Sequence, residues 1–144
     1  MDSVERAYGA LTAPSWRFAE REYRRDPYSA TIERLREFFV VEETADLNDD
    51  VSCVYYLRNN SGRWVVYLSL VGKFAAVMVV GDQNRLLFDT TNRSRDIKTA
   101  LSESGVTIVP VEIMSTSVRF GAGDSKKVLF SLIFSDVDEL PWER

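Results

Sequence analysis

The sequence predicts an α+β fold in which N-terminal helices pack on a mainly antiparallel sheet of about six to seven strands, with one further short helix. Apolar residues in the first third recur at helical spacing, residues 51–89 have the composition and turn signals of successive strands, and 144 residues suit one domain. We therefore expect a single domain over 1–144. It would comprise a helical segment at 1–41, a sheet over 51–134 that includes a helix at 94–104, and an acidic tail at 135–144.

The most apolar stretch, WVVYLSLVGKFAAVMVV at 64–80, predicts a β-hairpin. It is shorter than the roughly 20 apolar residues that a membrane helix needs, and its branched and aromatic residues favour strands. Gly72 followed by Lys73 predicts a two-residue turn in which Gly72 has a positive φ. With the segments at 51–58 and 85–89, this hairpin would form an antiparallel meander of four strands.

Both faces of the predicted hairpin are largely apolar, whereas a sheet with one solvated face alternates apolar and polar residues. We therefore expect cover on both faces, with helices of the chain on one of them. On the other face two alternatives stay open. Either the protein's own helices and loops cover it, or a second copy or a protein partner does.

The N-terminal third predicts helices up to about residue 41. Asp26 followed by Pro27 is typical of a helix start, with Asp26 as the N-cap and Pro27 as the first helical residue. The helix that follows carries an apolar stripe that we expect to face the sheet: Tyr28, Ile32, Leu35 and Phe39.

The C-terminal part predicts one helix and three strands. Ser94 can cap the helix at 94–104, and Gly105 would end it. Pro110 places the strand at 106–114 at a sheet edge or a bulge, because proline cannot donate to the ladder. The segments SVRF and KKVLFSLIF would form a last hairpin around GAGDS.

The composition excludes several kinds of chemistry. The chain has no histidine and one cysteine, Cys53, which removes His-dependent catalysis, His-containing metal sites and any internal disulfide. We expect Cys53 to be a buried, inert thiol, because no basic partner lies near it in the sequence. The residues GAGD at 121–124 resemble a motif of ribokinase-like sugar kinases, but their flanks predict strands, so we interpret them as a hairpin loop. We expect no cofactor, no metal and no catalytic residue.

The charge pattern favours a protein partner. The net charge of −4 and the isoelectric point of about 4.9 disfavour nucleic acid. Acidic residues gather at 42–50 and in the tail, so we expect an acidic patch for a basic partner. Trp142 either caps the core or serves as an exposed anchor. The candidate partner-binding residues are Asp49, Asp50, Asp138, Glu139 and Trp142.

The N-terminus lacks the basic start and apolar run of a signal peptide, so we expect a cytoplasmic protein that does not enter a membrane. Its plan, with helices before RWVVYLSLVGKFAAVMVV and SRDIKTALSESG after it, resembles the small cytoplasmic immunity proteins of polymorphic and contact-dependent inhibition toxin systems. The resemblance implies a non-catalytic protein that neutralises a cognate toxin by binding it, often through an acidic surface that meets a basic nuclease. It carries over no individual site residue.

Two other function classes stay open. Secretion chaperones are also small, acidic α/β proteins, and they act as dimers, so a homodimer would fit that class. Their usual order places a helix at each end of the sheet region, whereas this C-terminus predicts a strand and a tail. The second alternative is a small enzyme of unknown reaction, which would need a pocket that gathers Asp, Lys and Tyr from several strands.

Overall fold

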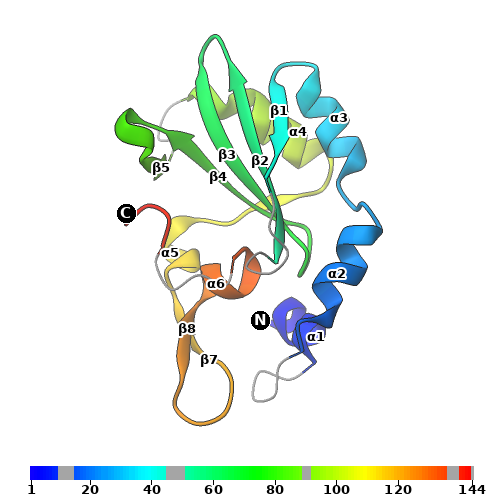
Figure 1. The fold of residues 1–144 in the computed structure, drawn as a ribbon, viewed down its shortest axis with the longest axis vertical. Helices are drawn as coiled ribbons and strands as arrows, with labels where there is room; N and C mark the ends of the chain where they lie inside the picture. The colour runs from blue at the N-terminus through cyan, green and yellow to red at the C-terminus, as the bar shows by residue number, and fades with distance from the viewer. Residues whose placement is uncertain (10–14, 45–50, 89–91, 136–139, 144) are drawn as a thin grey trace.

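The strands predicted between residues 51 and 89 lie at the centre of the computed structural model (Figure 1). They are β2 (Ser52–Asn59), β3 (Gly62–Ser69), β4 (Phe74–Val80) and β5 (Leu86–Phe88), and each pairs antiparallel with the next. The predicted meander and the α+β fold class are therefore confirmed. The structure describes residues 1–9, 15–44, 51–88, 92–135 and 140–143.

Two further strands complete a six-stranded sheet of order β1-β2-β3-β4-β5, in which β6 also pairs with β4. Strand β1 (Val40–Glu43) pairs antiparallel with β2, and β6 (Thr107–Ile108) pairs parallel with β4. The predicted helical segment extends to residue 41, and that boundary is wrong because β1 begins at Val40. Two consecutive β-branched residues, Val40 and Val41, follow the last helix and favour an extended chain.

The turn at Gly72 differs from the predicted two-residue turn in its length and in its backbone conformation. Strand β3 ends at Ser69 and β4 begins at Phe74, so the connection spans residues 70–73, and Gly72 does not have a positive φ. An added Cβ at this position would lie 2.8 Å from the Phe74 ring, so a larger residue would require that ring to shift. The hydroxyl of Tyr28 lies within hydrogen-bond distance of the Ser69 carbonyl, 2.5 Å, and the Gly72 carbonyl, 2.9 Å.

The N-terminal helices are α1 (Asp2–Tyr8), α2 (Arg17–Arg24) and α3 (Ser29–Arg36). The predicted start of the third helix at Pro27 is wrong. Asp26 has a φ of 48°, and the Tyr28 position caps the helix instead. The predicted apolar stripe is confirmed, because all four of its residues are buried: Tyr28, Ile32, Leu35 and Phe39.

The predicted helix near residue 94 is confirmed as α4 (Arg95–Glu103), with Ser94 at the N-cap position. The predicted strand at 106–114 is mostly wrong. The strand is limited to β6, and Pro110 then precedes α5 (Val111–Met114) at its N-cap position. A proline lacks the N–H that a strand uses, but the start of a helix does not need that N–H.

The last predicted hairpin is present as β7 (Ser117–Arg119) and β8 (Lys126–Val128), but the second strand is shorter than expected. The chain turns into the helix α6 (Leu129–Ile133). A short apolar run fits a strand and a buried helix equally well, so periodicity alone cannot separate them. The helix places the rings of Phe130 and Phe134 near Tyr67 of β3, with centroids 5.4 and 6.2 Å away.

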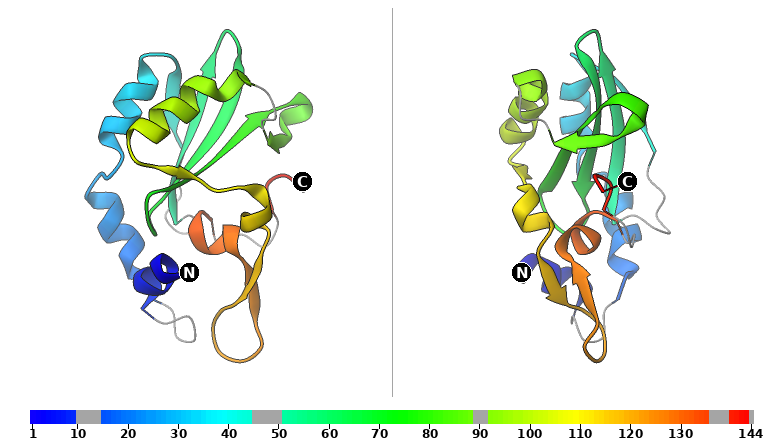
Figure 2. Two further views of the ribbon diagram at one scale, coloured as in Figure 1. Left: turned by 180° about the vertical axis from the view of Figure 1, so that it is seen from behind. Right: turned by 90° about the vertical axis from the view of Figure 1, so that its left-hand side faces the viewer.

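The two faces of the sheet are covered differently (Figures 1 and 2). Helices α3 and α4 lie on the face that carries Cys53 and Trp64, and Phe39 meets the Trp64 ring there at 5.3 Å. The opposite face carries Val54, Tyr56 and Tyr67, and we call it the groove face. Within the described ranges, α6 packs against its lower end and no helix crosses its upper part.

Candidate functional site

A groove of about 1030 Å³ lies on the groove face and crosses four strands. It begins where β1 ends and reaches the connection between β4 and β5, and the chain near the C-terminus forms its other wall. Its described lining residues are Thr44, Val54, Tyr56, Arg63, Tyr67, Val80, Gln83, Asn84, Arg85, Leu86, Ser135, Pro141 and Glu143.

The floor of the groove is apolar because neighbouring strands present paired side chains to the same face. Val54 lies directly opposite Tyr67 in the β2–β3 ladder, and both side chains are buried. Val80 lies opposite Leu86 in the β4–β5 ladder, and both are half-buried. The groove therefore offers a hydrophobic base with polar groups at its rim, as ligand-binding and protein-binding surfaces do.

Tyr56 is the most exposed aromatic residue at the groove, with 47% of its surface accessible. Val40 of the neighbouring strand β1 is 49% exposed. The ladder pairs Val40 with Arg58 and Glu42 with Tyr56, so Val40 and Tyr56 are diagonal neighbours on the groove face. A tyrosine and a β-branched residue thus form an exposed strip along one side of the groove.

Arginines gather at the same end of the sheet. Arg58 and Arg63 lie directly opposite each other across the β2–β3 turn. The Arg63 guanidinium donates a hydrogen bond to the Asn84 side-chain oxygen, 3.4 Å away, and Arg85 is the next residue. Among the residues that the structure describes, no carboxylate lies within 4.0 Å of Arg58, Arg63 or Arg85.

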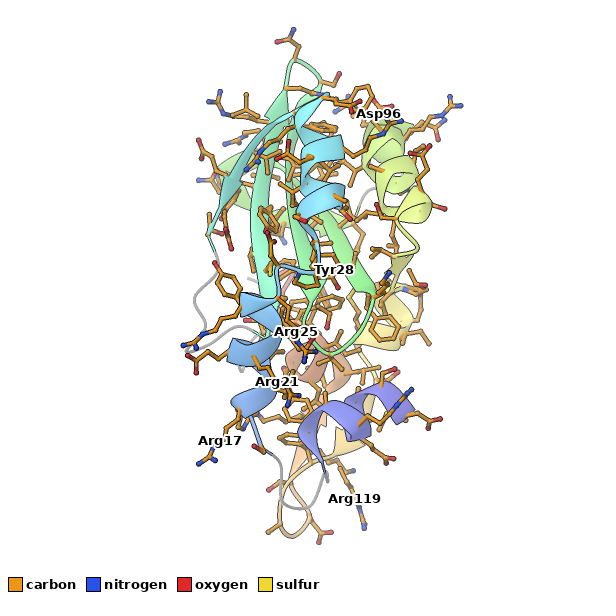
Figure 3. All side chains as sticks on the ribbon, turned by 90° about the vertical axis from the view of Figure 1, so that its right-hand side faces the viewer. Arg17, Arg21, Arg25, Tyr28, Asp96 and Arg119 are labelled. Carbon is orange, nitrogen blue, oxygen red and sulfur yellow. The ribbon has the colours of Figure 1, made fainter. Side chains whose placement is uncertain are left out.

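The arginines of helix α2 have a different environment from the arginines beside the groove. Figure 3 shows Arg17, Arg21 and Arg25 along that helix. Arg25 pairs with Glu22 at 3.0 Å, and Arg21 approaches the same carboxylate at 3.5 Å. Arg21, Arg24 and Arg25 therefore each contact a glutamate of the same helix, as expected for an exposed helix with charges of both signs.

A strained turn carries one wall of the groove. Gln83 and Asn84 both have positive φ, 55° and 59°, as in the type I′ turns that join hairpin strands. The Gly81 amide donates a hydrogen bond to the Arg85 carbonyl at 2.8 Å and closes this hairpin. Glycine, Asn and Asp tolerate that backbone region, but glutamine at the first of these positions is unfavourable. The turn points Asn84 and Arg85 toward the groove.

Trp142 lies close to the opposite wall but packs inward. Its ring contacts Phe88 at 4.8 Å and Phe130 at 5.2 Å, both nearly edge-on, and its side chain is half-buried. This packing favours the first alternative for Trp142, a cap on the core, and its role as an anchor for a partner stays a prediction. Its neighbours Pro141 and Glu143 line the groove.

The acidic candidate residues Asp49, Asp50, Asp138 and Glu139 lie outside the described residues, so their predicted role is not tested. The described residues that border these two acidic segments can be placed relative to the groove. Thr44 is the last described residue before 45–50, and Ser135 is the last one before 136–139. Both line the groove.

Cys53 is buried, as the sequence predicts, at 4% exposure on the helix-covered face. Burial, with a smaller contribution from the nearby carboxylates of Glu43 and Asp26, raises the pKa of its thiol to about 12. The GAGDS segment forms the β7–β8 loop, where Asp124 meets Arg119 at 3.5 Å. Within the described ranges no three Cys, Asp or Glu residues are placed to hold a metal ion.

Three residues that line the groove, Tyr56, Arg63 and Arg85, were not predicted as site residues, and neither was Arg58, which lies opposite Arg63. One signal was available. Arg58 and Arg63 flank the turn at 59–62 symmetrically, so a hairpin with that register had to place the two positive charges side by side.

Comparisons of the chain with family models, with curated proteins and with solved structures found no match. None of the helices in the described part of the chain has the length and apolarity needed to cross a membrane. The geometry of the groove therefore carries the functional argument.

Proposed function

We propose that this protein is a non-catalytic protein-binding module that acts as an immunity protein and neutralises a cognate toxin by binding it. The observation that carries the proposal is the groove on the less-covered face of the sheet, with half-exposed Tyr56 and Val40 beside it. Exposed apolar residues that lie next to each other and are bordered by charged residues are typical of surfaces that bind another protein.

The residue types around the groove support the same proposal. Tyrosine and arginine are enriched among the residues that contribute most to binding energy in protein interfaces. Here Val40 lies directly opposite Arg58 on the groove face, and Tyr56 is the diagonal neighbour of Val40. A partner that covers Tyr56 would remove its ring from water and also exclude water from the nearby guanidinium groups.

A second copy of the chain is the other candidate for this surface, as in the chaperone-like alternative. A second copy could extend the sheet by pairing with its exposed edge strand β1, but that edge is unfavourable for pairing. Strand β1 carries Glu42 and Glu43, both exposed, and charged residues on an edge strand oppose pairing with another strand. We therefore favour a different protein as the partner.

The test uses two matched substitutions. Tyr56 and Leu87 are equally exposed, at 47%, but Leu87 pairs with Val79 and so faces away from the groove. The immobilised wild-type chain and the Leu87→Ser variant should each retain one toxic host protein from an extract, and the Tyr56→Ser variant should not. Purified wild-type chain should also inhibit the toxicity of the retained protein.

Equal retention by the Tyr56→Ser and Leu87→Ser variants would remove the groove from the proposal. Size-exclusion chromatography of the wild type and Tyr56→Ser variant addresses the alternative. A wild-type dimer that the Tyr56→Ser substitution converts to a monomer would contradict a toxin-binding surface and support the chaperone-like class instead.

A further inference from the structure

We infer that the groove binds an acidic segment of the partner protein, with carboxylates on Arg63 and Arg85 and apolar side chains on the floor. The inference rests on the proposed function, because it takes a protein as the partner. It adds the chemistry of the segment that enters the groove. It concerns a surface different from the acidic segments that the sequence analysis singled out.

The positive charges of Arg58 and Arg63 lie close together beside the groove. Arg58 and Arg63 are cross-strand neighbours on one face, and like charges directly opposite each other destabilise a sheet. The structure supplies no compensating carboxylate within 4.0 Å among the described residues. By contrast, Arg24 and Arg25 at the end of α2 each contact a glutamate of their own helix. An anionic partner would relieve the repulsion.

A hydrogen bond to the neighbouring turn orients the side chain of Arg63. Its guanidinium donates to Asn84, which sits in the strained Gln83–Asn84 turn, and Arg85 follows directly in the chain. Unfavourable backbone conformations that persist often belong to functional sites, where they fix a group in place. An arginine that is already oriented loses less conformational entropy when it forms a two-pronged pair with a carboxylate.

The shape and polarity of the groove also bear on what it binds. Its volume of about 1030 Å³ and its apolar floor suit several side chains of an extended segment better than one small anion. Glu143 lines the opposite wall, so a carboxylate of the partner would be repelled there and attracted to the arginine side. The groove therefore favours one orientation of an acidic segment that also contains apolar residues.

The probe is a fluorescein-labelled peptide of alternating Glu and Leu residues, whose binding to the full chain is measured by fluorescence anisotropy. The Arg63→Gln/Arg85→Gln variant should bind it about tenfold or more weakly. The control variant Arg17→Gln/Arg95→Gln should bind like the wild type, because it changes the net charge equally at exposed positions that do not line the groove. Added salt should weaken binding to the wild type.

Three results would overturn the inference: no binding of the Glu–Leu peptide by the wild type, equal weakening in both double variants, or tighter binding of a matched Lys–Leu peptide. Preferential binding of a labelled single-stranded DNA would overturn it too, in favour of a phosphate-binding surface. Circular dichroism of each variant checks that the fold is unchanged. Retention of the host toxin by the Arg63→Gln/Arg85→Gln variant at wild-type affinity would reject the acidic segment and leave the proposed function intact.

Discussion

At the scale of single residues, burial decides how Cys53 behaves. The thiol lies on the helix-covered face, and burial raises its pKa to about 12 from an ordinary value near 9. A thiol that stays protonated is a poor nucleophile, so its chemistry matches the inert role that the sequence predicts.

The raised pKa of Cys53 makes the stability of the protein fall at high pH. The folded state keeps the proton above about pH 9, whereas the unfolded state releases it. The contribution of Cys53 to the free energy of unfolding is therefore complete below about pH 9 and is lost progressively toward about pH 12. Between about pH 9 and 10, the wild type should lose about 1 kcal/mol more than a Cys53→Ala variant in urea unfolding.

Between about pH 9 and 10 the buried tyrosines contribute little to the loss of stability, because their ordinary pKa near 10 lies at the upper end of this range. If the wild type and the Cys53→Ala variant lost stability in parallel, the burial of the thiol would not explain the effect. Alkylation of Cys53 in the native protein at about pH 8 should also be far slower than in urea.

At the scale of elements, two buried serines attach helix α6 to the sheet. The Ser69 hydroxyl donates to the Ile133 carbonyl at 2.6 Å and accepts from the Val71 amide at 3.1 Å. The Ser52 hydroxyl donates to the Phe134 carbonyl at 2.6 Å. These bonds satisfy carbonyls at the end of a short helix that has few bonds of its own.

The Ser69→Ala variant should therefore lower the free energy of unfolding by about 1–3 kcal/mol, because it leaves a buried carbonyl and an amide without their partner. Ser52→Ala removes a single bond and should cost less. Urea unfolding followed by circular dichroism measures both values. A larger effect of Ser52→Ala than of Ser69→Ala would contradict this account of how α6 is held.

The turn between β4 and β5 predicts a substitution that raises the free energy of unfolding instead of lowering it. Gln83 has a φ of 55°, and a residue with a Cβ pays about 1–2 kcal/mol in that region. Gln83→Gly should raise the free energy of unfolding by about 1 kcal/mol, while Gln83→Ala should leave it nearly unchanged. Thermal unfolding of the two variants tests the prediction, and a stabilising Gln83→Ala change would show that the side chain rather than the backbone is unfavourable.

At the scale of the whole molecule, the charges are distributed unevenly. Seven of the 22 acidic residues, but one of the 18 basic residues, lie in the segments outside the described part of the chain. Those segments therefore carry a formal charge of −6, while the described part carries +2. The chain offers a partner both acidic segments and a groove with arginines on its rim, which favours a partner with both signs of charge.

The acidic segments should act on the rate of association. Replacing Asp49, Asp50 and Asp138 by Asn and Glu139 by Gln should slow association with the retained toxin about tenfold at low salt and flatten its salt dependence. Stopped-flow or surface plasmon resonance measures the rate. The control neutralises four exposed acids elsewhere: Asp2, Glu5, Asp96 and Glu112. Equal rates for the two variants would rule out steering by the candidate residues.

The sequence by itself determined the fold class, the four-stranded meander and the buried stripe of α3, because these depend on local composition and on the spacing of apolar residues. It did not determine the conformation of 129–133, since a short apolar run suits a strand and a buried helix equally. That segment is helical because Phe130 and Phe134 then both reach Tyr67.

Only the tertiary structure decided where the groove lies. The apolar pattern required cover on both faces of the sheet, and it could not specify how far each cover extends. Helices α3 and α4 cover one face, whereas on the other face the described residues that provide cover are those of α6 and the chain near Trp142, which reach part of it. The groove and its arginines lie where that cover ends, because cross-strand register and the packing of distant segments bring together residues that are far apart in the chain.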